Sequence, residues 1–177
     1  MYELKYFLAK VKFKLSGNNK EVMSDYFRKA GMSIKGGCNI CCNIMTMEPF
    51  LVDIGSNVTI SGDVKLVTHD NSVAKLNIGG ADVFGRIVIG DNCFIGQNSI
   101  IMYGVELANN IIVAAGSVVC NSFSETNIVI GGNPAKKIGT WDALREKSLP
   151  YAISRSKAKE LNLHGDYSRF ISRKKKE

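Results

Sequence analysis

Residues 87–119 read IVIGDNCFIGQNSIIMYGVELANNIIVAAGSVV, and a branched aliphatic residue returns in them at every sixth position. The same spacing begins upstream, in residues 54–66. A period of six excludes an amphipathic α-helix, whose apolar residues recur at a period of about 3.6. Because Gly, Asn and Asp fill the gaps, the pattern predicts very short strands separated by bends. The sixth-position residues are Ile54, Ile60, Leu66, Ile89, Ile95, Ile101, Leu107, Val113 and Val119.

Three such six-residue units would close one turn of a triangular prism, so residues eighteen apart would stack on one another. A single coil cannot bury its own apolar face, so each inward aliphatic residue needs copies above and below it. Asn, Asp and Gly suit the corners because they tolerate left-handed backbone angles. A β-sandwich is the alternative, but its turns usually come about every 8–12 residues. The predicted stacks are Ile89 under Leu107, Ile95 under Val113, and Ile101 under Val119.

These repeats, which close on GGNPAK at residues 131–136, resemble the hexapeptide-repeat acyltransferases. The runs EPFLV at 48–52 and THD at 68–70 look most like the xenobiotic, maltose and capsular-sugar O-acetyltransferase branches. The resemblance covers about residues 34–140 and implies a mainly β fold, a left-handed parallel β-helix. The left hand comes from the resemblance and not from the spacing.

The chain divides by pattern into three segments. We expect an N-terminal helical segment at 1–33, the β-helix domain at 34–139 and a helical, basic C-terminal tail at 140–177. The six-residue register fails between residues 67 and 86, which predicts a loop over 70–86 that leaves the prism. Long loops in compact domains are usually functional, and His69 stands where this one begins.

Apolar residues recur at helical spacing near the N-terminus, and Ser16-Gly17-Asn18-Asn19 ends that pattern before a second helix. We expect the apolar stripe to pack on its own protein and to cover the open first coil, because an uncovered end exposes strand edges. Contact with a membrane surface stays open. The stripe consists of Leu4, Phe7, Leu8, Val11 and Leu15.

The composition is that of an ordinary globular protein of 177 residues, with 45% hydrophobic and 22% charged residues. No apolar run is long enough to span a membrane, and the opening MYEL does not resemble a secretory signal, so we expect a cytoplasmic protein. The formal charge of +7 is concentrated near both termini. These basic termini leave peripheral membrane contact open; we expect no nucleic-acid partner.

Five cysteines occur, at 38, 41, 42, 93 and 120. Cys38-x-x-Cys41 could hold a metal, but no second pair with zinc-like spacing follows it. Cys38 and Cys93 fall in inward positions of the repeat, so buried thiols acting as small hydrophobic residues are the simpler interpretation. We expect no metal.

The chemistry depends on His69, one of only two histidines. A γ-class carbonic anhydrase would share the prism but needs three histidines on its zinc. By its match to Thr68-His69-Asp70, the resemblance implies that His69 is a catalytic base that removes a proton from an acceptor hydroxyl. A structural histidine is the alternative. Glu48 is our candidate for the group that orients this ring, with Asp70 and Asp53 as rivals.

The resemblance implies that acetyl-CoA is the acyl donor and that it lies in the groove between subunits of a homotrimer. The matching cofactor positions are Gln97, Ala115, Gly116, Ser117 and Lys136, where Lys136 would meet phosphates as a point charge. One departure is that Cys120-Asn121-Ser122 stands where the family often carries Thr-Lys-Asp, which removes a cation.

The predicted function is acetyl transfer to a hydroxyl of a sugar or polysaccharide-type acceptor, catalysed between subunits. Two alternatives remain. One is N-acetyl transfer to an amino sugar, since an amine could use the same base. The other is a non-catalytic trimeric repeat module, because fold alone does not determine function.

Overall fold

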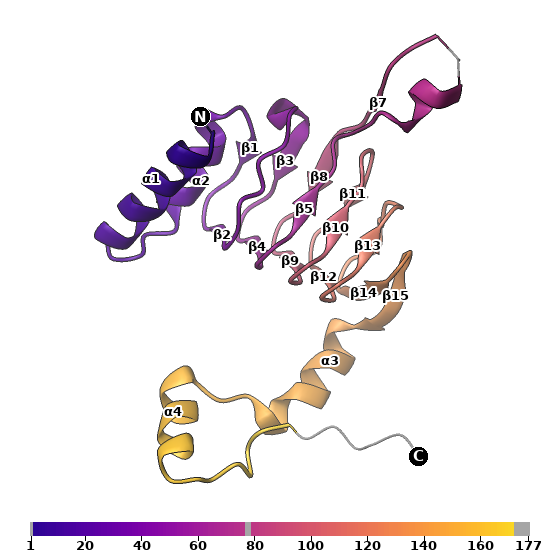
Figure 1. The fold of residues 1–177 in the computed structure, drawn as a ribbon. Coiled ribbons are helices and arrows are strands. Elements are labelled where there is room, and N and C mark those ends of the chain that lie inside the picture. The colour runs from indigo at the N-terminus through magenta and orange to yellow at the C-terminus, as the bar shows by residue number, and fades with distance from the viewer. Residues whose placement is uncertain (1, 77–78, 172–177) are drawn as a thin grey trace. The chain divides into compact units, whose positions relative to one another are not determined.

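A computed structural model describes residues 2–76 and 79–171 (Figure 1). The chain forms two compact units that meet in sequence between Gly139 and Thr140. The first unit holds two helices and all the parallel strands, and the second is helical. The basic run Arg173-Lys174-Lys175-Lys176 lies outside the described residues.

The first unit begins with helices α1 (Tyr2–Leu15) and α2 (Glu21–Lys29) and continues in short strands. Its strands are β1 (Ser33–Ile34), β2 (Asn39–Ile40), β3 (Val52–Ile54), β4 (Thr59–Ile60), β5 (Lys65–Leu66), β6 (His69–Asp70), β7 (Val83–Phe84), β8 (Ile87–Ile89), β9 (Phe94–Ile95), β10 (Ile100–Ile101), β11 (Glu106–Leu107), β12 (Ile111–Val113), β13 (Val118–Val119), β14 (Ile128–Gly132) and β15 (Ala135–Thr140).

Apart from the pair β6-β7, the strands build three sheets, and from β3 to β13 the chain visits these sheets in a fixed rotation. Their strand orders are β1-β3-β8-β11, β13-β10-β5 and β15-β14-β12-β9-β4-β2. The pairing is parallel throughout β1-β3-β8-β11 and β13-β10-β5, and from β14 to β2 in the third sheet. The predicted stacks are confirmed, because Ile89 pairs with Leu107, Ile95 with Val113 and Ile101 with Val119. A mainly β fold wound from six-residue units follows.

The core is the column of inward aliphatic side chains between the three sheets. Ile60, Ile95 and Val113, which stack in one sheet, are each 0% exposed. Cys38 and Cys93 are buried beside them, and each thiol donates to a backbone carbonyl, as the buried-thiol interpretation requires. Most corners carry a left-handed residue, and this confirms the predicted role of Asn, Asp and Gly. Left-handed corner residues are Gly37, Asn57, Asp63, Asn92, Asn98, Gly104, Asn110 and Gly116.

The N-terminal helices cover the first coil, as expected, but not with the predicted face of α1. Met23 and Phe27 of α2 are buried in the core, and α2 contacts β1 and β2. The face of α1 that packs inward carries Tyr6, Ala9 and Phe13. The predicted stripe was therefore assigned wrongly, because its members are exposed: Leu4 63%, Phe7 60%, Leu8 57%, Val11 38% and Leu15 83%.

The predicted excursion is a hairpin that leaves the coil after β5. Strands β6 and β7 pair antiparallel, with His69 opposite Phe84, and a 3₁₀ turn (Ser72–Leu76) follows β6. The hairpin returns at Gly85, where an added Cβ would lie 2.9 Å from the carbonyl carbon of Tyr103. A side chain there would displace backbone, so glycine allows the hairpin to rejoin the coil.

The third sheet continues past the turn at Asn133-Pro134. Strand β15 follows that turn and lies beside β14, so one more strand closes the sheet. The second unit holds α3 (Trp141–Ser148), a 3₁₀ turn (Leu149–Tyr151) and α4 (Arg155–Leu163). The C-terminal tail is therefore helical, as predicted, and the 3₁₀ turn interrupts it.

Substitution of Asn98 tests whether the left-handed corner residues stabilise the coil. Its φ is 59°, a conformation that a β-branched side chain resists by about 1–2 kcal/mol. We expect Asn98→Val to lower the free energy of unfolding by about 1 kcal/mol relative to Asn98→Gly, which adopts this angle freely. Denaturant unfolding of both variants measures the difference. Equal stability of the two variants would contradict a conformational role.

Candidate active site

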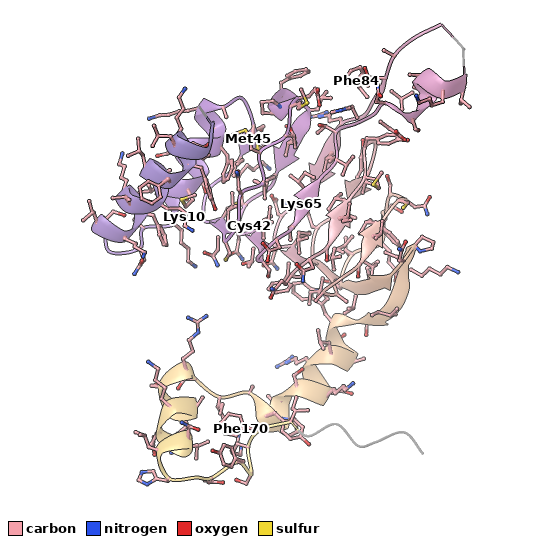
Figure 2. The ribbon with its side chains drawn as sticks, in the orientation of Figure 1. Lys10, Cys42, Met45, Lys65, Phe84 and Phe170 are labelled. Atoms are coloured by element: carbon pink, nitrogen blue, oxygen red, sulfur yellow. The ribbon has the colours of Figure 1, made fainter. Side chains whose placement is uncertain are left out.

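The hairpin fixes the position of the predicted base. His69 opens β6, and its ring centroid lies 5.9 Å from that of Phe84 on β7. Figure 2 marks Phe84 on this hairpin. The Gly85 amide donates to the Thr68 carbonyl at 3.0 Å, which extends the pairing by one residue. The His69 side chain is therefore held by two strands while 30% of it stays exposed.

Glu48 lies beside His69, although twenty-one positions separate them in sequence. One Glu48 carboxylate oxygen, Oε2, is 2.9 Å from His69 Nδ1. The same oxygen accepts a hydrogen bond of 2.7 Å from the hydroxyl of Thr68, a residue only 2% exposed. Both donors lower the pKa of Glu48, the Thr68 hydroxyl most of all. Glu48 is therefore a carboxylate that can fix the tautomer of His69.

The two rival carboxylates are occupied elsewhere. Asp53 Oδ2 accepts from Arg86 Nε at 2.6 Å. Asp70 accepts from the Ser72 amide at 2.8 Å and from the Tyr103 hydroxyl at 3.3 Å, so it stabilises the start of the hairpin. Among the three candidates, the structure brings only Glu48 into hydrogen-bonding distance of the His69 ring.

This arrangement can act as a base. When Nδ1–H donates to Glu48, the lone pair of the neutral imidazole resides on Nε2. A neutral ring whose other nitrogen is held by a carboxylate is the arrangement that general-base catalysis uses. Thr68 is the member of this candidate site that the sequence analysis missed. We quoted it only as part of a motif, and the hydroxyl itself gave no separate signal.

Three of the predicted cofactor positions meet at one corner of the coil. Gln97 lies at the bend between β9 and β10, and Ala115 and Gly116 lie at the equivalent bend between β12 and β13. The Gly116 amide donates to the Gln97 carbonyl at 2.8 Å, so the two bends stack directly. Gly116 has φ +72° and open space where a Cβ would stand. This edge therefore offers exposed backbone and small side chains.

The other two cofactor positions differ from each other. The Ser117 side chain is 1% exposed; its hydroxyl donates to the Ala114 carbonyl and accepts from the Gly132 amide, so it holds the bend from inside. Lys136 is exposed on β15. Its neighbour Lys137 pairs with Glu125.

The His69 pair and the Gln97–Gly116 corner lie at opposite ends of the strands of one sheet. Strands β5, β10 and β13 run parallel. His69 follows the end of β5, whereas Gln97 and Gly116 precede the starts of β10 and β13. One chain therefore presents the two groups on different edges of the coil.

Comparison with known proteins decides the family. A family model described as the hexapeptide repeat of succinyl-transferase matches residues 86–120. Protein CapG of Staphylococcus aureus is 39% identical over 138 residues, which are 75% of this chain and 80% of the relative. The chain belongs to the hexapeptide-repeat acetyltransferase family. The resemblance to this family that we identified from the repeats and motifs is confirmed. The chain is an acetyltransferase.

Two further members of the hexapeptide-repeat family are similar over most of the chain. Galactoside O-acetyltransferase of Escherichia coli is 31% identical over 134 residues, which are 74% of this chain and 66% of that protein. The crystal structure of a maltose O-acetyltransferase from Clostridium difficile shares 23% identity and a TM-score of 0.54, covering 78% of this chain and 84% of the other. This structural likeness concerns the fold.

Substitution of Thr68 tests whether its hydroxyl stabilises the ionised form of Glu48. Thr68→Val keeps the shape and removes the hydroxyl, so we expect a loss of about 1–3 kcal/mol in unfolding free energy near neutral pH. Because the pKa of Glu48 is lowered in the folded state, this loss should shrink as pH falls through that pKa and the carboxylate becomes protonated.

Denaturant unfolding at neutral and acid pH measures the effect, and Thr68→Ser, which keeps the hydroxyl, is the matched control. A penalty for Thr68→Val that stays the same at both pH values would show that the hydroxyl does not act on the carboxylate charge.

Proposed function

We propose that this protein transfers an acetyl group from acetyl-CoA to a hydroxyl of a sugar or polysaccharide-type acceptor, with His69 as the base. The observation that carries the proposal is the 2.9 Å contact between His69 Nδ1 and the Glu48 carboxylate. The name of one relative, a galactoside O-acetyltransferase, supports a saccharide acceptor.

The residues divide the work as follows. His69 Nε2 removes the proton of the acceptor hydroxyl while its oxygen attacks the acetyl carbonyl carbon. Acetyl-CoA supplies that carbonyl as a thioester. Glu48 stabilises the positive charge that His69 gains, and Thr68 keeps Glu48 ionised. The proton on Nε2 can then be returned to the departing sulfur, so the base is regenerated.

The Gln97–Gly116 edge fits the coenzyme. Its open, left-handed Gly116 and the exposed methyl of Ala115 leave room for a narrow chain that carries amide groups. The charge of exposed Lys136 suits phosphates, whereas Lys137 is already paired with Glu125. Ser117 would contact the coenzyme only through its backbone atoms, because its hydroxyl is buried.

We further propose that the coil is the left-handed β-helix of the family and that it assembles as a homotrimer. The sheet between the two edges presents half-buried apolar side chains outward, among them Ile100 and Val118. Apolar faces of this kind suit a protein interface. Packing this face on a second copy would bring one chain's Gln97–Gly116 edge to the neighbour's His69.

His69→Ala tests the base. We expect normal folding and a fall in acetyl transfer of at least about a hundredfold, since the imidazole is lost from the transition state. Thiol release from acetyl-CoA, measured with sugar and amino-sugar acceptors, reports the activity. His164→Ala is the matched control, because that exposed histidine caps α4 in the other unit.

Turnover retained in His69→Ala would overturn the assignment of the base. Faster turnover of the unchanged protein with amino sugars than with the matching hydroxyl sugars would assign N-transfer instead.

The shared site is tested by mixing two inactive variants. His69→Ala removes the base, and Ala115→Trp fills the coenzyme edge with a bulky ring. Each should be inactive as a homotrimer. Mixed trimers should regain activity, because some interfaces then join an intact His69 to an intact edge on the neighbouring copy.

Co-expression with two different tags and sequential purification isolates these mixed trimers. Mixed trimers without activity, from subunits that assemble normally, would place both groups of one site on the same chain.

A further inference from the structure

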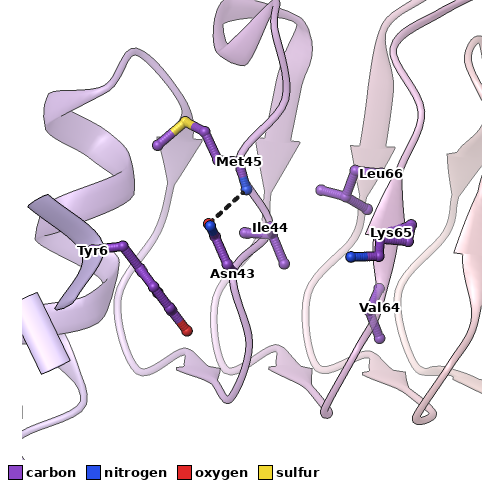
Figure 3. A pocket seen from close by; sticks show the side chains of 7 residues that line it. All are labelled: Tyr6, Asn43, Ile44, Met45, Val64, Lys65 and Leu66. Atoms are coloured by element: carbon purple, nitrogen blue, oxygen red, sulfur yellow. Dashed lines mark hydrogen bonds between the residues drawn. The ribbon is translucent and has the colours of Figure 1, made fainter. Parts of the chain in front are cut away.

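Helix α1 carries two apolar faces, and only one of them packs on the rest of the first unit. Tyr6, Ala9 and Phe13 pack on the core. Tyr6 lies 5.8 Å from the ring of Tyr26 and 6.3 Å from that of Phe27. Figure 3 shows Tyr6 beside Asn43, and both residues line a cavity of about 280 Å³. This face attaches α1 to the rest of the first unit.

The opposite face is apolar and exposed. At 100° per residue, the helix places its five members within one arc. All are more than a third exposed, and Leu15 reaches 83%. We call this group the outer stripe; it consists of Leu4, Phe7, Leu8, Val11 and Leu15. A cluster of large apolar side chains on a surface usually marks an interaction site.

Lysines border the outer stripe on both sides. Lys5 and Lys12 project about 80–100° from Leu4 in one direction, and Lys14 and Lys10 project about 80° and about 120° in the other. All four are exposed; Lys10 also lies 5.7 Å from the centroid of the Tyr6 ring. Lysines in such flanking rows can extend their ammonium groups to the level at which the apolar side chains enter a nonpolar medium.

We propose that α1 lies in the surface of an anionic phospholipid bilayer, with the outer stripe among the acyl chains and the flanking lysines at the phosphates. A helix with one apolar arc between basic flanks has the composition of an interfacial helix. Among the described residues no helix is long and apolar enough to cross a membrane.

A hollow beside the stripe adds to this surface. It measures about 520 Å³ and opens between α1 and α2. Leu8 of the stripe lines it together with Lys5 and Lys29, so two ammonium groups and an apolar wall adjoin. This combination suits a phosphate headgroup whose acyl chains continue along the stripe.

The lysines beside the outer stripe favour an anionic bilayer over a second copy of this chain as the binding partner. Two outer stripes packed together would bring the lysine rows of both helices into proximity, and like charges repel. An anionic surface instead attracts every lysine in the rows.

The test is co-sedimentation of the full-length protein with vesicles. We expect binding to vesicles of equal parts phosphatidylglycerol and phosphatidylcholine, and at least about tenfold weaker binding to phosphatidylcholine alone. Raising salt from about 0.1 M to about 1 M should weaken it, because the Debye length falls from about 10 to about 3 Å. Failure to bind the anionic vesicles would overturn the proposal.

Two double variants assign the binding to α1. Phe7→Gln with Leu15→Gln removes apolar contact, and Lys12→Gln with Lys14→Gln removes charge; each should weaken binding about tenfold or more. Leu149→Gln with Leu163→Gln and Lys147→Gln with Lys159→Gln are matched controls on exposed residues of the second unit. Equal losses in the controls would show that binding is not directed by α1.

Enzyme activity and oligomeric state distinguish membrane binding from catalysis and from self-association. Acetyl transfer to a soluble acceptor should be unchanged in both α1 variants, so a failure of this proposal leaves the proposed function intact. Light scattering reports the oligomeric state. A smaller assembly in the Phe7→Gln, Leu15→Gln variant would show that the outer stripe binds another copy, and would overturn the membrane assignment.

Discussion

Parallel pairing of inward aliphatic residues is the constraint on which the first unit depends. Strands of two or three residues cannot hold together alone, so each is stabilised by the copies that stack above and below it. The column Ile60–Ile95–Val113 keeps this contact although its steps in sequence are unequal. Val113 stands eighteen positions after Ile95, but Ile95 stands thirty-five after Ile60. Extra residues are therefore accommodated only at corners, where they leave the stack intact.

The candidate site arises from these departures. His69 belongs to the hairpin that lengthens one step, and Glu48 belongs to an earlier irregular segment, between β2 and β3. Both segments lead into the same sheet, at the neighbouring strands β3 and β8, so the two side chains meet at one edge. The regular repeats provide a frame, and the residues free of the six-residue pattern form the candidate site. Thr68 lies between the last regular strand before the hairpin and the hairpin itself, and its buried hydroxyl donates to Glu48.

The period of six was enough to predict which residues stack, because register in a coil follows directly from spacing. It could not choose among Glu48, Asp53 and Asp70, all polar residues near one edge. Only the resemblance favoured Glu48, and the structure shows why the other two are engaged: Arg86 holds Asp53, and the hairpin holds Asp70. The contact of Thr68 was unpredictable for a similar reason. Adjacent strand residues normally point to opposite faces, yet Thr68 and His69 both reach one carboxylate oxygen.

Helix α1 shows where periodicity misleads. Its sequence holds two apolar faces, Tyr6, Ala9 and Phe13 on one and the outer stripe on the other, and helical spacing alone cannot say which one packs. The larger stripe was the natural choice for the core, but the aromatic pair Tyr26 and Phe27 of α2 receives Tyr6 instead. A helix that served only to cover the first coil would need one apolar face and could carry charge on the other. The second apolar face stays exposed and has lysines along both of its borders, and this is why we propose a binding partner outside the chain.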